Sequence, residues 1–233
     1  MSGIVGIVQL DGTPVDRELL ERMTGSLAAR GPDAQQTWGR GGVGFGHTLL
    51  RTTWESSGES QPLTLDGQTW IVADCRVDAR DELLRALADR GCAAETDAPD
   101  PELILRAYTV WGEACLDRLL GDFSFAIWDE GHRTLVCARD HFGVKPFFYV
   151  HVDRTFIVSN DLNCLRLHPS VPTSSMRWRS RRRRHPGGSG WVRLHLVLEH
   201  GDSGRRWRRT REGAVPPVPA HERSDLEGLD AEV

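Results

Sequence analysis

The sequence changes character near Thr173, and this break limits any folded core to the residues before it. Residues 1–173 hold 16 basic and 25 acidic residues, whereas residues 174–233 hold 13 arginines and 8 acidic residues. The later stretch has no Phe, Tyr, Ile, Asn, Gln, Lys or Cys, and its apolar residues show no periodicity that would support a core. We therefore expect one domain over residues 2–172 and an Arg- and Pro-rich tail over residues 173–233 that is not an independent domain.

The tail carries two arginine clusters, at 181–184 and 205–209, the second with a tryptophan inside it. Basic runs with aromatic residues occur in nucleic-acid-binding proteins, but no fold supports that function here. Nucleic acid is thus not expected as a partner, and a nucleic-acid-binding tail on a scaffold domain is the weakest alternative. The preferred interpretation is a disordered or aberrant segment, such as GC-rich DNA read in a shifted frame.

The composition of the chain excludes several classes of protein. Hydrophobic residues make up 39% and charged residues 27%, which fits a globular protein rather than a disordered one. No run approaches the roughly 18 apolar residues of a membrane span, and the N-terminus lacks the basic and apolar regions of a signal peptide. Five cysteines without a C-x-x-C pair predict neither a disulfide framework nor a metal site, so we expect a cytoplasmic protein that binds no metal.

Apolar periodicity predicts six to eight strands and three helices, with the strands gathered at both ends of the domain. This distribution favours an α+β fold over an alternating parallel sheet. The expected strands are 4–8, 41–53, 70–73, 123–127, 134–138, 147–150 and 155–158. The expected helices are 19–27, 83–87 and 100–111, with a short helical segment at 113–120.

Four motifs occur in order along the domain: S-G-I-V-G at residues 2–6, R-G-P-D at 30–33, G-D-F-S-F-A-I-W-D at 121–129 and R-D-H-F-G-V-K-P at 139–146. Together they resemble the class II, N-terminal-nucleophile glutamine amidotransferase domain of asparagine synthetase-like proteins. The resemblance covers residues 2–170. It implies a four-layer αββα sandwich, in which two mostly antiparallel sheets lie between helix layers, in agreement with the α+β pattern.

The resemblance also implies a reaction that begins at the N-terminus. In the family, removal of Met1 frees a cysteine whose thiolate attacks the side-chain amide of glutamine, with the chain's own α-amine as base. An α-amine with a pKa of about 8 suits that role. This chain has Ser2 at the cysteine position, and a hydroxyl needs stronger activation than a thiol. Ser2 is therefore either a candidate nucleophile or simply the end of a buried strand.

Residues 47–51 align with the family's H-E-R-L-S segment. The arginine that holds the glutamine carboxylate becomes Leu49, which cannot form a bidentate pair with it. Leu50 follows, and Arg51 is expected on the same strand face as Leu49, where it would partly replace the missing arginine.

The family's N-G-E segment aligns with Asp74, Cys75 and Arg76. There an asparagine amide and a glycine N–H stabilise the oxyanion, whereas an ionised Asp74 offers only acceptors and would repel developing negative charge. We expect Arg76 to form a structural ion pair with Asp74. Asp100 matches the aspartate that receives the substrate ammonium, or it caps the helix that starts there.

These substitutions predict an amidotransferase-like domain with degraded glutaminase activity, so L-glutamine is a doubtful partner. The alternative is an active amidohydrolase that uses Ser2 to release ammonia from glutamine. Family members bind ATP and Mg through an S-G-G-x-D-S loop in a C-terminal synthetase domain. Residues 186–190 lack its aspartate, so we expect no cofactor in this chain and a missing or separate synthetase half.

Overall fold

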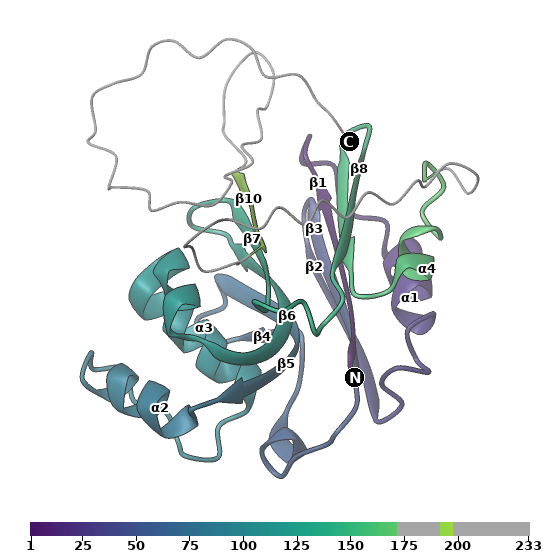
Figure 1. Ribbon diagram of the computed structural model, residues 1–233. Coiled ribbons are helices and arrows are strands. Elements are labelled where there is room, and N and C mark those ends of the chain that lie inside the picture. Colours follow the sequence, from purple (N-terminus) through teal and green to yellow (C-terminus); the bar gives the residue numbers. More distant parts are fainter. Residues whose placement is uncertain (172–191, 198–233) are drawn as a thin grey trace, which may run out of the picture.

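The computed structural model describes residues 1–171 and the short strand at 192–197. Two five-stranded sheets face each other in it (Figure 1). Sheet A has the order β2-β3-β1-β9-β8, and sheet B has the order β10-β7-β6-β5-β4. The neighbouring strands in both sheets pair antiparallel. The strands are β1 (Gly3–Gln9), β2 (Ala34–Arg40), β3 (Val43–Leu49), β4 (Leu63–Thr64), β5 (Thr69–Asp78), β6 (Leu120–Asp129), β7 (Thr134–Arg139), β8 (Phe148–Val152), β9 (Thr155–Ser159) and β10 (Val192–Val197).

Helices cover the outer face of each sheet, which completes the expected αββα sandwich. Figure 1 shows α1 and α4 outside sheet A, and α2 and α3 outside sheet B. None of the helices in the described residues is long and apolar enough to cross a membrane. The helices are α1 (Arg17–Gly25), η1 (Glu55–Gly58), α2 (Arg80–Ala88), α3 (Asp100–Trp111), η2 (Gly112–Arg118) and α4 (Leu162–Leu165).

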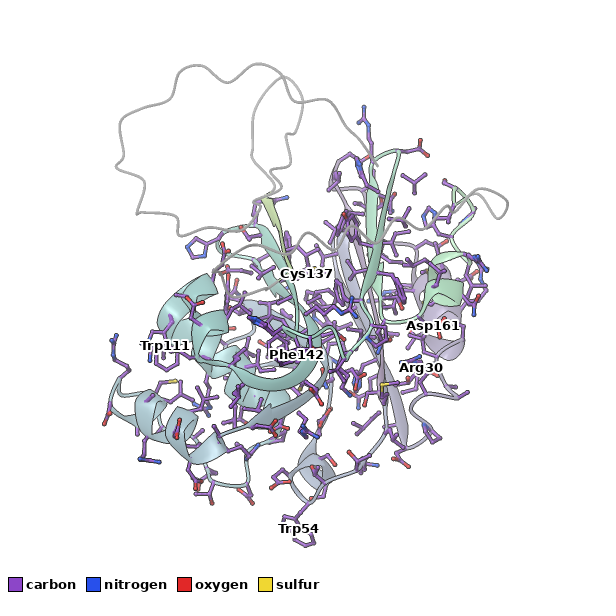
Figure 2. All side chains as sticks on the ribbon, in the orientation of Figure 1. Arg30, Trp54, Trp111, Cys137, Phe142 and Asp161 are labelled. Atoms are coloured by element: carbon purple, nitrogen blue, oxygen red, sulfur yellow. The ribbon has the colours of Figure 1, made fainter. Side chains whose placement is uncertain are left out.

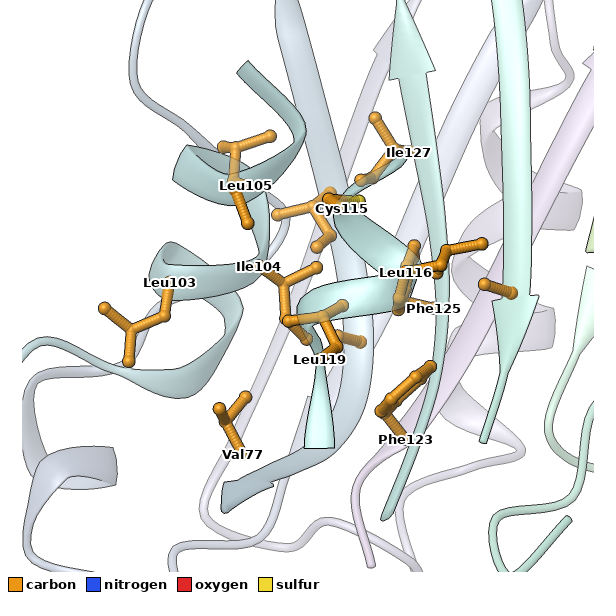
Figure 3. Close-up of a cluster of buried hydrophobic side chains, with 14 of the residues drawn as sticks. Val77, Leu103, Ile104, Leu105, Cys115, Leu116, Leu119, Phe123, Phe125 and Ile127 are labelled. Carbon is orange, nitrogen blue, oxygen red and sulfur yellow. The ribbon is translucent and has the colours of Figure 1, made fainter. Parts of the chain in front are cut away.

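Three buried apolar clusters match the three interfaces between these layers. One joins sheet B to α2, α3 and η2, and Figure 3 shows part of it around Ile104, Leu116 and Phe125. A second lies between the two sheets and contains Phe45 and Trp128. The third packs α1 and α4 against sheet A.

Strand β1 illustrates how the sequence assigns residues to these layers. Val5 and Ile7 belong to the cluster under α1, whereas Ile4 and Val8 belong to the cluster between the sheets. Side chains alternate along a strand, so Ser2 is in phase with Ile4 and faces the space between the sheets. The N-terminus lies at one end of the sandwich (Figure 1).

Several expected elements differ from the structure. The segment expected to be helical to residue 120 ends at Arg118, and β6 begins at Leu120. Strand β5 runs five residues beyond the predicted end at Ala73. Strands β2 and β4 are not predicted by the sequence, because β2 is mostly exposed and polar and β4 has only two residues. Val192–Val197 lies in the predicted tail yet pairs with β7 as β10, and the other tail residues lie outside the described part of the chain.

Close packing of α1 on sheet A requires a residue without a Cβ at position 46, which is Gly46. A Cβ at this position would collide with Thr24 Oγ1 and lie 2.9 Å from Val5 Cγ1. Gly46→Ala should therefore lower the free energy of unfolding by about 1–3 kcal/mol in urea titrations. Gly58→Ala is the control, since no atom lies within 4 Å of the position that its Cβ would occupy. Equal stability of the two variants would contradict this packing.

Candidate functional site

The two sheets are bridged at the N-terminal end by Ser2 and Asp74. The backbone N–H of Ser2 donates to Oδ1 of Asp74 on β5 at 3.2 Å. The hydroxyl oxygen of Ser2 accepts the backbone N–H of Leu50 at 3.1 Å. Both side chains are buried, with 7% of Ser2 and 4% of Asp74 exposed. A buried carboxylate therefore lies next to the backbone N–H of the candidate nucleophile.

Lys145 neutralises this buried carboxylate. Its Nζ lies 2.8 Å from Oδ1 of Asp74, and its side chain is 14% exposed. Lys145 is the only lysine in the chain. It is fixed by the loop after β7, where the carboxylate of Asp140 accepts the N–H groups of Val144 (2.8 Å) and Lys145 (2.9 Å).

Asn160, which follows β9, fixes the backbone around Ser2. Its Oδ1 accepts the N–H of Ile4 at 3.0 Å, and its Nδ2 donates to the Ser2 carbonyl at 2.7 Å. The same Nδ2 lies 3.4 Å from Oδ2 of Asp74. Beside it, Asp161 pairs with Arg30 at 3.5 Å (Figure 2). Segments far apart in sequence thus converge on the first residues of the chain.

A pocket of about 250 Å³ opens beside this cluster, between the end of β3 and the loop that precedes β4. Leu49 and Arg51 line it, together with His47, Glu59 and Gln61. Trp54 projects from the same loop and is 81% exposed (Figure 2). Leu50, whose N–H the Ser2 hydroxyl accepts, lies between Leu49 and Arg51 of the pocket lining in sequence, so the pocket adjoins this contact.

Comparison with known proteins identifies the family. A model of the glutamine amidotransferase domain matches residues 1–177. The chain belongs to the glutamine amidotransferase domain family. Asparagine synthetase [glutamine-hydrolyzing] 3 of Bacillus subtilis strain 168 is 36% identical over 175 residues, covering 73% of this chain and 28% of that relative. Asparagine synthetase [glutamine-hydrolyzing] 1 of the same organism is 32% identical over 164 residues, covering 68% and 26%.

The chain thus spans little more than a quarter of the length of these curated relatives. Among solved structures, glutamine phosphoribosylpyrophosphate amidotransferase from B. subtilis aligns with a TM-score of 0.61 at 16% identity, covering 89% of this chain and 49% of that one. This likeness supports the fold. The predicted resemblance and the αββα architecture are both confirmed, and the amidotransferase domain is of the class II, asparagine synthetase type.

Within this amidotransferase domain, the expected Arg76–Asp74 ion pair is wrong. Arg76 instead pairs with Asp78 at 3.1 Å and with Asp122 at 3.3 Å. Residues 74 and 76 share a face of β5, but Asp74 is buried against Lys145, whereas Arg76 is exposed and lies opposite Asp122 of β6. The surrounding protein raises the pKa of the Cys75 thiol well above its ordinary value, chiefly through burial.

The aligned residues of the 47–51 segment are placed as follows. Leu49 is buried and ends β3, and Leu50 is half-buried. Arg51 lies beyond the strand, so the expectation that it shares a strand face with Leu49 is wrong. Its backbone N–H donates to Asp33 Oδ2 at 2.7 Å, which turns the chain outward while Arg51 still lines the pocket.

The second of the two predicted roles of Asp100, the cap of α3, is wrong, because Pro99 holds the cap position. The carboxylate of Asp100 accepts the N–H of Val77 at 3.0 Å and pairs with Arg80. Burial raises the pKa of Asp100, and these two partners oppose that rise. Whether Asp100 still receives a substrate ammonium stays a prediction, although its carboxylate already has two partners.

The motif at 139–146 forms a tight turn at Gly143, where φ is +67°. Arg139 donates to the Gly143 carbonyl, and the carboxylate of Asp140 accepts backbone N–H groups. Lys145 and Asn160 are site residues that the sequence did not predict. A single lysine in the chain and a polar residue directly after a buried strand were the available signals.

The carboxyl group of Glu59 makes the free energy of unfolding depend on pH. Burial raises the pKa of its carboxyl from 4.5 to about 7, with the nearby carboxylates of Asp100 and Asp74 adding to the rise. A raised pKa in the folded state means that the contribution of Glu59 to the free energy of unfolding is fully present below pH 4.5 and is lost as the pH rises through 7. From pH 5 to pH 8, urea unfolding should show the native chain losing about 1–3 kcal/mol relative to Glu59→Gln, whereas the lowered pKa of His47 acts in the opposite direction on both chains alike. Glu55→Gln should keep the loss, since the pKa of Glu55 is lowered and it titrates below this range.

The chemistry open to this arrangement is limited. Three donors already occupy the Asp74 carboxylate, and the described residues contain no group of three or more His, Cys, Asp or Glu that could hold a metal ion. The buried Cys137 and Cys164 have raised pKa values, that of Cys164 about 11, which fits unreactive core thiols.

Proposed function

We propose that this chain is an asparagine synthetase-type amidotransferase domain that has lost efficient glutamine hydrolysis and serves as a scaffold for an amide-forming synthetase domain. The contact between Asp74 and the Ser2 N–H carries the first part of the proposal. In this proposal, the Asp74 carboxylate takes the position where the reaction needs hydrogen-bond donors for a developing oxyanion. Removing one such donor costs about 10²–10³ in rate, and a negative charge in its place should cost more.

Asp74 also contacts the nitrogen that the reaction uses as its base. After removal of Met1, the amine of Ser2 would stand beside the Asp74 carboxylate, which accepts from Ser2 N at 3.2 Å. Burial lowers the pKa of the α-amine at Met1, and the opposing effect of Asp74 is offset by the Lys145 ammonium, which lies 2.8 Å from the same carboxylate oxygen. In this proposal the loss of glutaminase therefore comes from the missing oxyanion donor and from the weak hydroxyl nucleophile.

The amide-forming step belongs, in this proposal, to a synthetase domain supplied beyond these 233 residues or by a separate chain. The curated relatives are named as glutamine-hydrolyzing asparagine synthetases, and this chain aligns with about a quarter of their length. No S-G-G-x-D-S motif occurs in the sequence. ATP and Mg would then bind to that partner, in the cytoplasm, and not to this domain.

Hydrolysis of L-glutamine is the direct test. Ammonia and glutamate release by the purified full chain should stay at the rate seen with Ser2→Ala. Turnover that disappears in Ser2→Ala would overturn the scaffold proposal.

That outcome would favour the second candidate, an N-terminal-serine amidohydrolase. One observation supports this candidate: Met1 is 53% exposed, so an aminopeptidase can reach it and free Ser2. Intact-mass measurement of the purified protein should accompany the assay. A chain that keeps Met1 cannot use the Ser2 amine as base, and turnover by such a chain would contradict this candidate.

Sequencing the coding DNA past codon 173 and translating the other two frames tests the partner. An S-G-G-x-D-S motif in an open frame would support a synthetase half encoded there. If neither frame is open, association with a separate synthetase chain remains the prediction, and failure to co-purify any ATP-binding partner from the source cells would count against it.

A further inference from the structure

The pocket beside β3 contains a carboxyl group that glutamine hydrolysis does not use. Glu59 lines this cavity of about 250 Å³ and is only partly exposed. The walls around it include apolar side chains from Ala34 and Leu49. A partly apolar hollow with two charged side chains, Glu59 and Arg51, has the character of a small-molecule site.

Neighbouring side chains fix Glu59 but leave part of its hydrogen-bonding capacity open. Gln61 Nε2 donates to Glu59 Oε1 at 2.6 Å. The same amide is anchored to Ala73, from which Oε1 accepts at 2.6 Å and to which Nε2 donates at 3.0 Å. Gln61 therefore has no further proton to give, and no hydrogen bond to Oε2 of Glu59 is present among the described residues.

A second pocket residue also has an unpaired polar atom. His47 is 1% exposed, lines the cavity, and its Nε2 makes no hydrogen bond within the described part of the structure. Burial lowers the pKa of His47 to about 4, so the ring is neutral near pH 7 and adds no positive charge. A buried polar atom without a partner costs free energy, and a ligand or water in the cavity can supply that partner.

The charges that face Glu59 determine which ligand suits the pocket. Asp74 on β5 and Asp100 on α3 are negative, and each is already paired, with Lys145 and Arg80 respectively. Arg51 at the rim is the cation that acts on Glu59, and its Nη1 lies 3.5 Å from the Asp33 carbonyl. The inner end of the cavity, with Glu59 and the neutral His47, therefore favours a positive charge.

We propose that this pocket binds a small primary amine, with its ammonium on Glu59, its apolar stem along Leu49 and Ala34, and a hydrogen bond to His47. This ligand lacks the carboxylate of an α-amino acid, so Arg51, whose guanidinium contacts the Asp33 carbonyl, is not needed to bind it. The proposal does not depend on whether glutamine is hydrolysed.

Calorimetric titration of the full chain with n-butylammonium chloride tests the proposal. At pH 8 we expect saturable binding in the millimolar range, the range expected for a ligand with so few heavy atoms. Butyrate and n-butanol, which share the stem but lack the positive charge, should bind at least about tenfold more weakly. Glu59→Gln should weaken amine binding at least about tenfold, whereas Glu55→Gln, on the same loop but outside the pocket lining, should leave it unchanged.

The pH dependence gives a readout that a purely structural Glu59 would not produce. Because the carboxyl has a pKa of about 7, its ionised fraction should fall about tenfold from pH 8 to pH 6, and the affinity for butylammonium with it. Equal binding of butyrate, unchanged binding by a folded Glu59→Gln variant, or no binding at pH 8 would each overturn the proposal. Retained glutaminase would not, so failure of this inference is separable from failure of the scaffold function.

Discussion

Lys145→Met should lower the free energy of unfolding by about 3–5 kcal/mol, the usual result of leaving a buried carboxylate without its partner. Asp74 is 4% exposed, and the Lys145 ammonium lies 2.8 Å from its Oδ1. Methionine keeps most of the stem but removes the charge. Urea titration at pH 7, followed by tryptophan fluorescence and circular dichroism, measures the change.

Two further variants separate charge from packing. Adding Asp74→Asn to Lys145→Met should recover most of the lost stability, since no unpaired charge is then buried. Arg76→Met, which breaks a pair that is 58% exposed on its arginine side, should cost no more than about 1 kcal/mol. If Lys145→Met unfolds at the same urea concentration as the native chain, the pair is not a buried contact on which the fold depends.

Restoring the family residues at five positions should create a glutaminase whose rate exceeds that of the native chain by at least about 10²-fold, the value of one oxyanion donor. Asp74→Asn exchanges the charge beside Ser2 for an amide donor, and Cys75→Gly opens the backbone next to it. The complete set is Ser2→Cys, Leu49→Arg, Asp74→Asn, Cys75→Gly and Arg76→Glu. Glutamate release from L-glutamine measures the gain.

The control for this gain is the same set with Ser2→Ala in place of Ser2→Cys, which should be inactive because no nucleophile remains. Intact mass must show that Met1 has been removed, since the free α-amine is the base. A folded, Met1-free variant without glutaminase would show that the alignment of these positions with the family site is wrong.

The sequence predicts helices and strands well where the spacing of the apolar residues follows which side chains are buried. β1 and the β8–β9 hairpin emerge from apolar runs, and α1 emerges from leucines at helical spacing. β2 does not, because it is an edge strand whose polar side chains mostly face solvent. Its pairing with β3 comes from backbone hydrogen bonds, which leave no mark on the residue pattern.

The residues of the candidate site likewise fall into those that the sequence predicts and those that it does not. Motif alignment locates Ser2 and Asp74, at the positions that align with the family's cysteine and asparagine. It does not locate the partner of Asp74, because Lys145 lies 71 residues away and reaches the carboxylate only through the folded loop after β7. Sequence reasoning instead pairs Asp74 with the nearby Arg76, whose contacts are Asp78 and Asp122. Proximity in sequence is a poor guide to partners across a sandwich.

The side chain of Gln61 performs a role that normally belongs to the backbone. β4 pairs with β5 only at Leu63–Ile71 and Thr64–Trp70, and the Gln61 amide then meets both the N–H and the carbonyl of Ala73. A backbone peptide can do this whatever its side chain, so ordinary strand positions tolerate many residues. Here the sheet contact itself depends on residue identity, because glutamate would lack the donor and asparagine the reach. Position 61 should therefore be among the least exchangeable in the domain, although its hydrogen bonds are to Glu59 and the backbone of Ala73 and not to Ser2.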